Sequence, residues 1–202
     1  MLRLIRRAAP LGILAALAIQ TNALAATVNV SMTNFVFTPK LANVQQGSAV
    51  LWTNNASSTS HTTTGDTPLS LWDSGSVSPG GTFMFTFTAA GKYTYHCSFH
   101  QSLGMVGTVS VPVKANPPSG PQGTQFKIIV ASVNAPAGFV YDIQKKDPGG
   151  SFQDWMVGLT SRTATFDSTL FAPGTYQFHA RLRNTGTGAA SLYSAAKSVM
   201  VT

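Results

Sequence analysis

The chain has 202 residues, of which 44% are hydrophobic and 9% are charged, and its formal net charge is +7. This length allows one large domain or two small ones. The basic residues are scattered along the chain and form no basic stripe of the kind that binds nucleic acid, so we expect no nucleic-acid partner.

The first 25 residues have the pattern of a secretory signal peptide. Arg3, Arg6 and Arg7 precede a short apolar run over residues 8–19, and Ala23-Leu24-Ala25 forms an A-x-A cleavage site. The apolar run is too short to span a bilayer. Removal of residues 1–25 leaves a net charge of +4 and no further apolar segment of membrane-spanning length. We therefore expect an exported protein, secreted or periplasmic, with no transmembrane segment in the mature chain.

Residues 26–113 show the alternation of apolar and polar side chains that is typical of β-strands. Glycine and proline interrupt the alternating runs at Gly47, Pro79-Gly80-Gly81 and Gly91, as expected for a β-sandwich. The inward-facing residues predicted for these strands are Val28, Val30, Met32, Val50, Trp52, Phe83, Phe85, Phe87, Tyr93, Tyr95, Cys97, Val109 and Val111. We interpret the phenylalanine stripe as part of the hydrophobic core.

Residues 114–124 contain three prolines and two glycines, which predicts a semi-extended linker between two domains. Residues 125–202 again alternate, most clearly at Tyr176, Phe178, Ala180 and Leu182 after Pro173-Gly174. This pattern, with the run Gly174-Thr-Tyr before an alternating strand, resembles a fibronectin type III domain. The resemblance implies a second, immunoglobulin-like sandwich.

The only cysteine of the chain lies in the segment Tyr93-Thr-Tyr-His-Cys97-Ser-Phe-His100-Gln-Ser-Leu-Gly-Met105. An unpaired cysteine in an exported protein needs an explanation, and metal ligation provides one. Cys97, His100 and Met105 offer a thiolate, an imidazole and a thioether on one loop between two predicted strands. A second imidazole would complete the His₂Cys set with a weak axial methionine that holds an electron-transfer copper ion.

Three further histidines could supply the second imidazole. His96 adjoins Cys97 on an extended strand, so its side chain should face away from the metal, and we interpret it as a surface histidine. His179 lies in the other domain, on the strand face of Gln177, Arg181 and Arg183 that we expect to be solvent-exposed. Elimination leaves His61, in a polar loop after a strand, as the second histidine ligand.

These motifs make residues 26–113 similar to a plastocyanin-type cupredoxin, a small exported blue-copper domain. The shared motifs are Gly47-x-x-Val-x-Trp52-x-Asn-Asn55, Asp73-Ser-Gly-Ser-Val-Ser-Pro-Gly80, Tyr93-x-Tyr-x-Cys97-x-x-His100 and Gly104-Met105-x-Gly107-x-Val109. The resemblance implies a Greek-key sandwich and one type 1 copper ion, Cu(I) or Cu(II), held by His61, Cys97, His100 and Met105. It also implies that the edge of His100 reaches the surface in an apolar patch.

The chain departs from the family at two positions beside the ligands. Ser60 and Phe99 stand where members of the family often have proline. Phe99 keeps a backbone N–H, so we expect it or the N–H of Thr62 to donate a hydrogen bond to the Cys97 sulfur.

The sequence favours one function and leaves an alternative. We expect an exported blue-copper protein that carries single electrons between transient redox partner proteins. The alternative is an extracytoplasmic module for copper scavenging or delivery, with the fibronectin-like domain docking to a protein or a cell-surface glycan. An enzyme is not expected, because neither a His-x-His pair for a multicopper cluster nor a Ser-His-acid set is evident.

Overall fold

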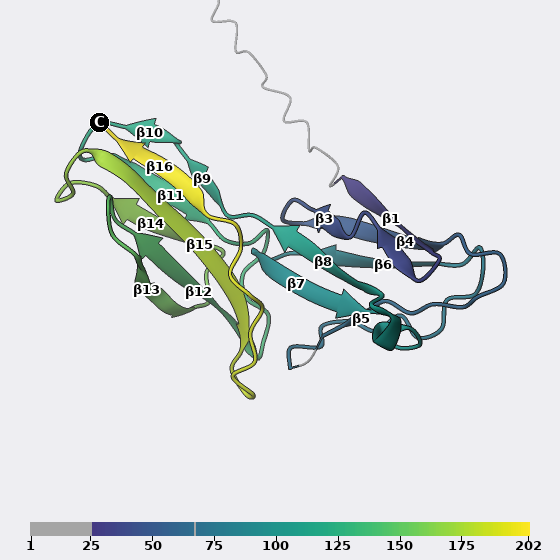
Figure 1. The fold of residues 1–202 in the computed structure, drawn as a ribbon. Helices are drawn as coiled ribbons and strands as arrows, with labels where there is room; N and C mark the ends of the chain where they lie inside the picture. The colour runs from purple at the N-terminus through teal and green to yellow at the C-terminus, as the bar shows by residue number, and fades with distance from the viewer. Residues whose placement is uncertain (1–25, 67) are drawn as a thin grey trace, which may run out of the picture.

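The computed structural model describes residues 26–66 and 68–202, which form two β-sandwiches placed end to end (Figure 1). Within this part of the chain the single helix is η1, a 3₁₀ turn over Gln101–Leu103, so no helix there is long and apolar enough to cross a membrane. The all-β prediction is confirmed. The predicted signal peptide, residues 1–25, lies outside the described residues.

The first sandwich consists of two four-stranded sheets, ordered β2-β1-β4-β6 and β3-β8-β7-β5. Its strands are β1 (Thr27–Thr33), β2 (Val36–Thr38), β3 (Leu41–Asn43), β4 (Ser48–Asn54), β5 (Thr64–Gly65), β6 (Thr82–Phe87), β7 (Gly91–His96) and β8 (Val106–Val111). The chain crosses between the sheets, since β2 and β4 lie in one sheet and β3 lies in the other. As a result β1 pairs with β4, and β3 pairs with β8, in parallel. The predicted inward faces meet in one core around Trp52, which is fully buried.

The second sandwich packs a three-stranded sheet, β14-β11-β9, on a five-stranded sheet, β10-β16-β15-β12-β13. Its strands are β9 (Lys114–Asn116), β10 (Ser119–Gly120), β11 (Gln125–Ile129), β12 (Phe139–Lys146), β13 (Phe152–Leu159), β14 (Thr163–Asp167), β15 (Gly174–Asn184) and β16 (Lys197–Val201). Tyr176, Phe178, Ala180 and Leu182 of β15 are buried, as the alternation predicted.

Residues 114–124, which we expected to form a semi-extended linker, also contribute two short strands to the second sandwich. β9 pairs antiparallel with β11, and β10 pairs parallel with β16, so the segment supplies an edge strand to each sheet of the second sandwich. The prolines are compatible with this arrangement because Pro117 and Pro118 lie between the two short strands and Pro121 follows the second.

The two sandwiches also contact each other directly, through hydrogen bonds and a shared core. The side chain of Gln46 donates hydrogen bonds to the carbonyl oxygens of Pro112 and Ile129, both at 2.9 Å. Lys92 of β7 and Leu192, in the segment between β15 and β16, exchange backbone hydrogen bonds of 2.9 and 3.1 Å. Ala89 of the first sandwich belongs to the core cluster of the second. The sandwiches are therefore joined by a continuous packed and hydrogen-bonded interface.

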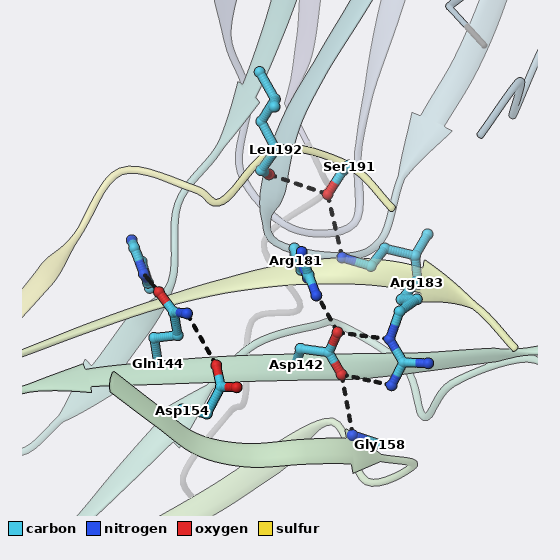
Figure 2. Close-up of polar contacts among 10 residues, drawn as sticks. Asp142, Gln144, Asp154, Gly158, Arg181, Arg183, Ser191 and Leu192 are labelled. Atoms are coloured by element: carbon cyan, nitrogen blue, oxygen red, sulfur yellow. Dashed lines mark hydrogen bonds and ion pairs between the residues drawn. The ribbon is translucent and has the colours of Figure 1, made fainter. Parts of the chain in front are cut away.

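A buried carboxylate organises one face of the five-stranded sheet (Figure 2). Asp142 of β12 is 1% exposed, and it accepts hydrogen bonds from Arg183 Nε at 2.7 Å and from Arg181 Nε at 3.0 Å. Arg183 Nη2 donates a third at 2.9 Å, and the N–H of Gly158 donates a fourth at 3.1 Å, from a position of β13 with a φ of +79°. Burial alone would raise the pKa of Asp142, but the hydrogen bonds from Arg183, Gly158 and Arg181 outweigh it and lower the pKa.

His179, on the same sheet, is less solvent-exposed than the sequence suggested. Its ring is stacked between the rings of Phe152, with centroids 3.8 Å apart, and Tyr193, with centroids 4.2 Å apart. Its Nε2 lies 2.8 Å from Oε1 of Gln144. Strand alternation correctly excludes His179 from the core, but it cannot show that aromatic side chains from other segments cover the outward face.

Candidate metal centre

The loop between β7 and β8 brings three of the predicted ligands together. The N–H of Cys97 donates to the carbonyl of Met105 at 3.0 Å, and the N–H of His100 donates to the carbonyl of Cys97 at 3.0 Å. Gly104 has a φ of +81°, a left-handed conformation that suits glycine and reverses the chain after η1. The backbone therefore fixes the loop through its own hydrogen bonds.

His61 approaches this loop from the long connection between β4 and β5. Its backbone exchanges two hydrogen bonds with Val77, at 3.1 and 2.8 Å. The buried side chain of Asn54 holds the same region by donating to the carbonyls of Thr59 and Val77, both at 2.8 Å. The polar loop is thus ordered by backbone pairing and a buried amide, and His61 is fully buried.

His61, Cys97 and His100 place their donor atoms in one small triangle. The two Nδ1 atoms are 3.2 Å apart, and Cys97 Sγ lies 3.3 Å from Nδ1 of His100 and 3.8 Å from Nδ1 of His61. A point equidistant from the three atoms lies about 2.0 Å from each, close to the 2.0–2.3 Å that first-row metals such as zinc make to imidazole nitrogen and thiolate. The triangle therefore has the size of a trigonal metal site.

The surroundings favour the protonation states that ligation requires. Burial lowers the pKa of His61, and repulsion from His100 lowers it further, which favours a neutral imidazole with a free lone pair. The backbone N–H of Thr62 donates to Cys97 Sγ at 3.3 Å, which confirms one of the two predicted donors. Among the described residues, Phe99 makes no such hydrogen bond.

Met105 is fully buried in the same core cluster as Cys97. Its N–H donates to the carbonyl of His100 at 3.2 Å, so its backbone is tied to two of the three residues that form the triangle. One thiolate and two imidazoles with a nearby thioether are a donor set suited to copper.

Two features near the site were not predicted. Phe35, in the tight turn between β1 and β2, places its ring 4.6 Å from the ring of His100 and 6.2 Å from that of His61, with a φ of +62°. His96 faces away from the metal triangle as expected, but its Nδ1 lies 2.6 Å from Oδ1 of Asp66. No local sequence pattern identifies these contacts, because each joins segments distant in the sequence.

Comparisons with known proteins agree with this site. Residues 24–112 match the family "Copper binding proteins, plastocyanin/azurin family". A chloroplastic plastocyanin of Tetradesmus obliquus is 29% identical over 103 residues, covering 47% of this chain and 71% of the plastocyanin. A plastocyanin of Mercurialis perennis is 52% identical over 33 residues, 16% of this chain and 33% of that protein.

Two solved structures are similar to part of this chain. A purple cupredoxin from Nitrosopumilus maritimus is 26% identical, with a TM-score of 0.38, over 42% of this chain and 98% of that one. The plastocyanin from Dryopteris crassirhizoma is 28% identical, with a TM-score of 0.37, over 43% of this chain and 99% of that one. The family match and the Cys-His₂ triangle together support a copper-binding domain of the plastocyanin/azurin type in the N-terminal half of the chain, with copper as its metal.

Proposed function

We propose that the protein carries single electrons through a type 1 copper site formed by His61, Cys97, His100 and Met105. The observation that carries the proposal is the convergence of one thiolate and two imidazole nitrogens in a triangle of metal-site size. Bound copper would supply the one-electron Cu(I)/Cu(II) couple. The protein's contribution is to hold the donors in one arrangement that suits both oxidation states.

The backbone supports this role by restricting movement of the donors. Hydrogen bonds between Cys97, His100 and Met105 fix one side of the site, and pairing of His61 with Val77 fixes the other. The N–H of Thr62 withdraws electron density from the Cys97 sulfur, which tunes the thiolate as a donor. A site so constrained should reorganise little when an electron arrives or leaves.

An apolar surface beside His100 suits brief contact with a redox partner. Phe35, Phe99 and Leu103 are 40%, 54% and 63% exposed, and the rings of both phenylalanines lie within 6.2 Å of the His100 ring. The copper domain has only two carboxylate side chains, Asp66 and Asp73. Docking on this surface should therefore depend on apolar contact more than on electrostatic steering.

We further propose that the second sandwich is a fibronectin type III-like docking domain. Its three-stranded sheet packs on a larger sheet, and the hydroxyl of Tyr176 donates to the carbonyl of Ala172 at 2.8 Å. A tyrosine that bonds to the backbone a few residues upstream, at the start of such a strand, is typical of immunoglobulin-like sandwiches. Its partner would be a protein or a cell-surface glycan.

Copper scavenging or delivery is the second candidate, and the burial of the donors disfavours it. His61, Cys97 and Met105 are fully buried, whereas rapid metal exchange needs donors within reach of an external ligand. The same closure leaves no evident coordination position for a substrate, so we do not propose an enzyme. The pattern of residues 1–25 supports export of the protein to the periplasm or the exterior.

The visible spectrum of the copper-loaded protein, combined with redox titration, tests the proposed function. Thiolate-to-Cu(II) charge transfer should give an intense visible band that disappears in Cys97→Ser. Met105→Leu is the matched variant: it should keep copper and the band but raise the reduction potential, because Cu(II) loses a weak donor. An unchanged spectrum in Cys97→Ser would refute the proposed site.

A further inference from the structure

A cavity of about 170 Å³ lies where the two sandwiches meet. The first sandwich contributes β7 and the segment after β5, and the second contributes residues 190–192. The cavity therefore exists only because the interface holds the two sandwiches in place. Binding pockets in proteins are frequently found at such junctions between domains.

Most of the cavity wall is apolar and aromatic. Leu71, Trp72, Tyr93 and Leu192 are among its lining residues, and Trp72 and Tyr93 are buried. The indole N–H of Trp72 donates to Oγ1 of Thr63 at 3.2 Å, so the orientation of this ring is fixed. A cavity of about 150 Å³ with apolar walls accommodates one benzene ring, which sets the ligand size at a single aromatic ring.

Two charged side chains, Asp66 and Lys92, give the cavity a polar edge. Oδ1 of Asp66 is occupied by His96, while Oδ2 makes no hydrogen bond to the described residues. The ammonium of Lys92 lies among the same lining residues and would repel an aromatic cation, which favours a neutral ligand. A carboxylate oxygen accepts hydrogen bonds only, so the matching group on the ligand is a donor.

We propose that this cavity binds a small neutral phenol. The ring would occupy the apolar part of the cavity, beside Leu71 and Trp72, and the hydroxyl would donate to Asp66. The site is separate from the metal ligands, although Asp66 contacts His96, the neighbour of Cys97. Binding should therefore occur both in the metal-free protein and in the Cu(I) protein.

The experiment follows the Trp72 indole N–H in ¹H–¹⁵N NMR spectra of the two-domain protein while phenol is added. Both the metal-free and the Cu(I) forms are titrated, so a failure of the copper proposal leaves this test intact. A saturable shift with a Kd of about 1 mM is expected, as a phenol-sized ligand can reach such an affinity. Toluene has the same ring without the donor, and it should bind at least about tenfold more weakly.

Two variants assign the binding to this cavity. Ala190 lines the cavity, and Ala190→Leu should abolish the shift by filling the space. Asp66→Asn keeps the shape but removes the charge, and it should weaken phenol binding by about tenfold while leaving toluene unaffected. The proposal is overturned if the Trp72 signal does not respond to phenol, or if toluene binds the wild-type protein as tightly. The phenol and toluene comparison needs no variant, so it stands even if a variant fails to fold.

Discussion

The stacked His179 should make the stability of the second sandwich fall as the pH is lowered. Burial lowers the pKa of His179 from 6.5 to about 4. Between these two values the unfolded chain binds a proton that the folded protein does not. The free energy of unfolding therefore falls as the pH drops through this window, and above pH 6.5 the contribution of His179 is constant.

The size of the effect follows from two opposing contributions. A pKa difference of about 2.5 units corresponds to about 3.4 kcal/mol. The rings of Phe152 and Tyr193, which face the imidazole, would attract its protonated form by about 0.5–1 kcal/mol each. We therefore expect a net loss of about 2 kcal/mol from His179 between pH 7 and pH 4.

The variant His179→Phe isolates this contribution because phenylalanine can stack in the same place and does not titrate. Urea unfolding is measured by tryptophan fluorescence, in which Trp155 reports on the second sandwich because it packs against Phe178. The stability difference between wild type and variant should change by about 2 kcal/mol across this pH range. Other histidines contribute equally to both proteins and cancel.

Gln177→Ala serves as the control, since it alters the same strand without removing a titratable group. Its stability difference from wild type should not depend on pH. A pH-independent difference for His179→Phe, or one that favours wild type more strongly at pH 4, would refute the reasoning.

Two other positions provide tests of the second sandwich and of the docking surface. Asp142→Asn should lower the free energy of unfolding by about 3 kcal/mol, because it leaves Arg181 and Arg183 without their buried charged partner. Thermal unfolding measures this change, and a loss below about 1 kcal/mol would contradict the prediction. Leu103→Asp should slow electron transfer to a partner protein at unchanged reduction potential, and wild-type transfer should vary little with ionic strength. If Leu103→Asp leaves the rate of electron transfer unchanged while His96→Ala lowers it, the electron leaves through His96 and not through the apolar surface.

The candidate metal centre was largely predictable from sequence because its determinants are local. Cys97, His100 and Met105 share one loop, and few histidines competed with His61 for the remaining position. Strand alternation likewise predicted the buried face of β15. In both cases, residues close in the sequence determine the outcome.

The interface and the outer surfaces could not be predicted in the same way. The prolines of residues 114–124 indicate a break in regular pairing, and Pro117 and Pro118 do separate β9 from β10. The pairing of these two short strands with β11 and β16 depends on segments distant in the sequence. The contacts of His179 with Tyr193, and of His100 with Phe35, join segments separated along the chain. Alternation gives the direction of a side chain and contains no information on which distant segment covers it.

The packed junction between the sandwiches also determines how the copper face is presented. η1 lies at the end of the first sandwich opposite the second one, and β7 and β8 run between these two ends (Figure 1). If the second sandwich binds a surface, the packed junction would hold His100 at a fixed distance from that surface, facing away from it. A flexible linker would let the copper face take many positions and orientations relative to that surface. The rigid junction restricts it to one distance and one orientation. Only electron donors and acceptors located at that distance from the surface would contact the copper face.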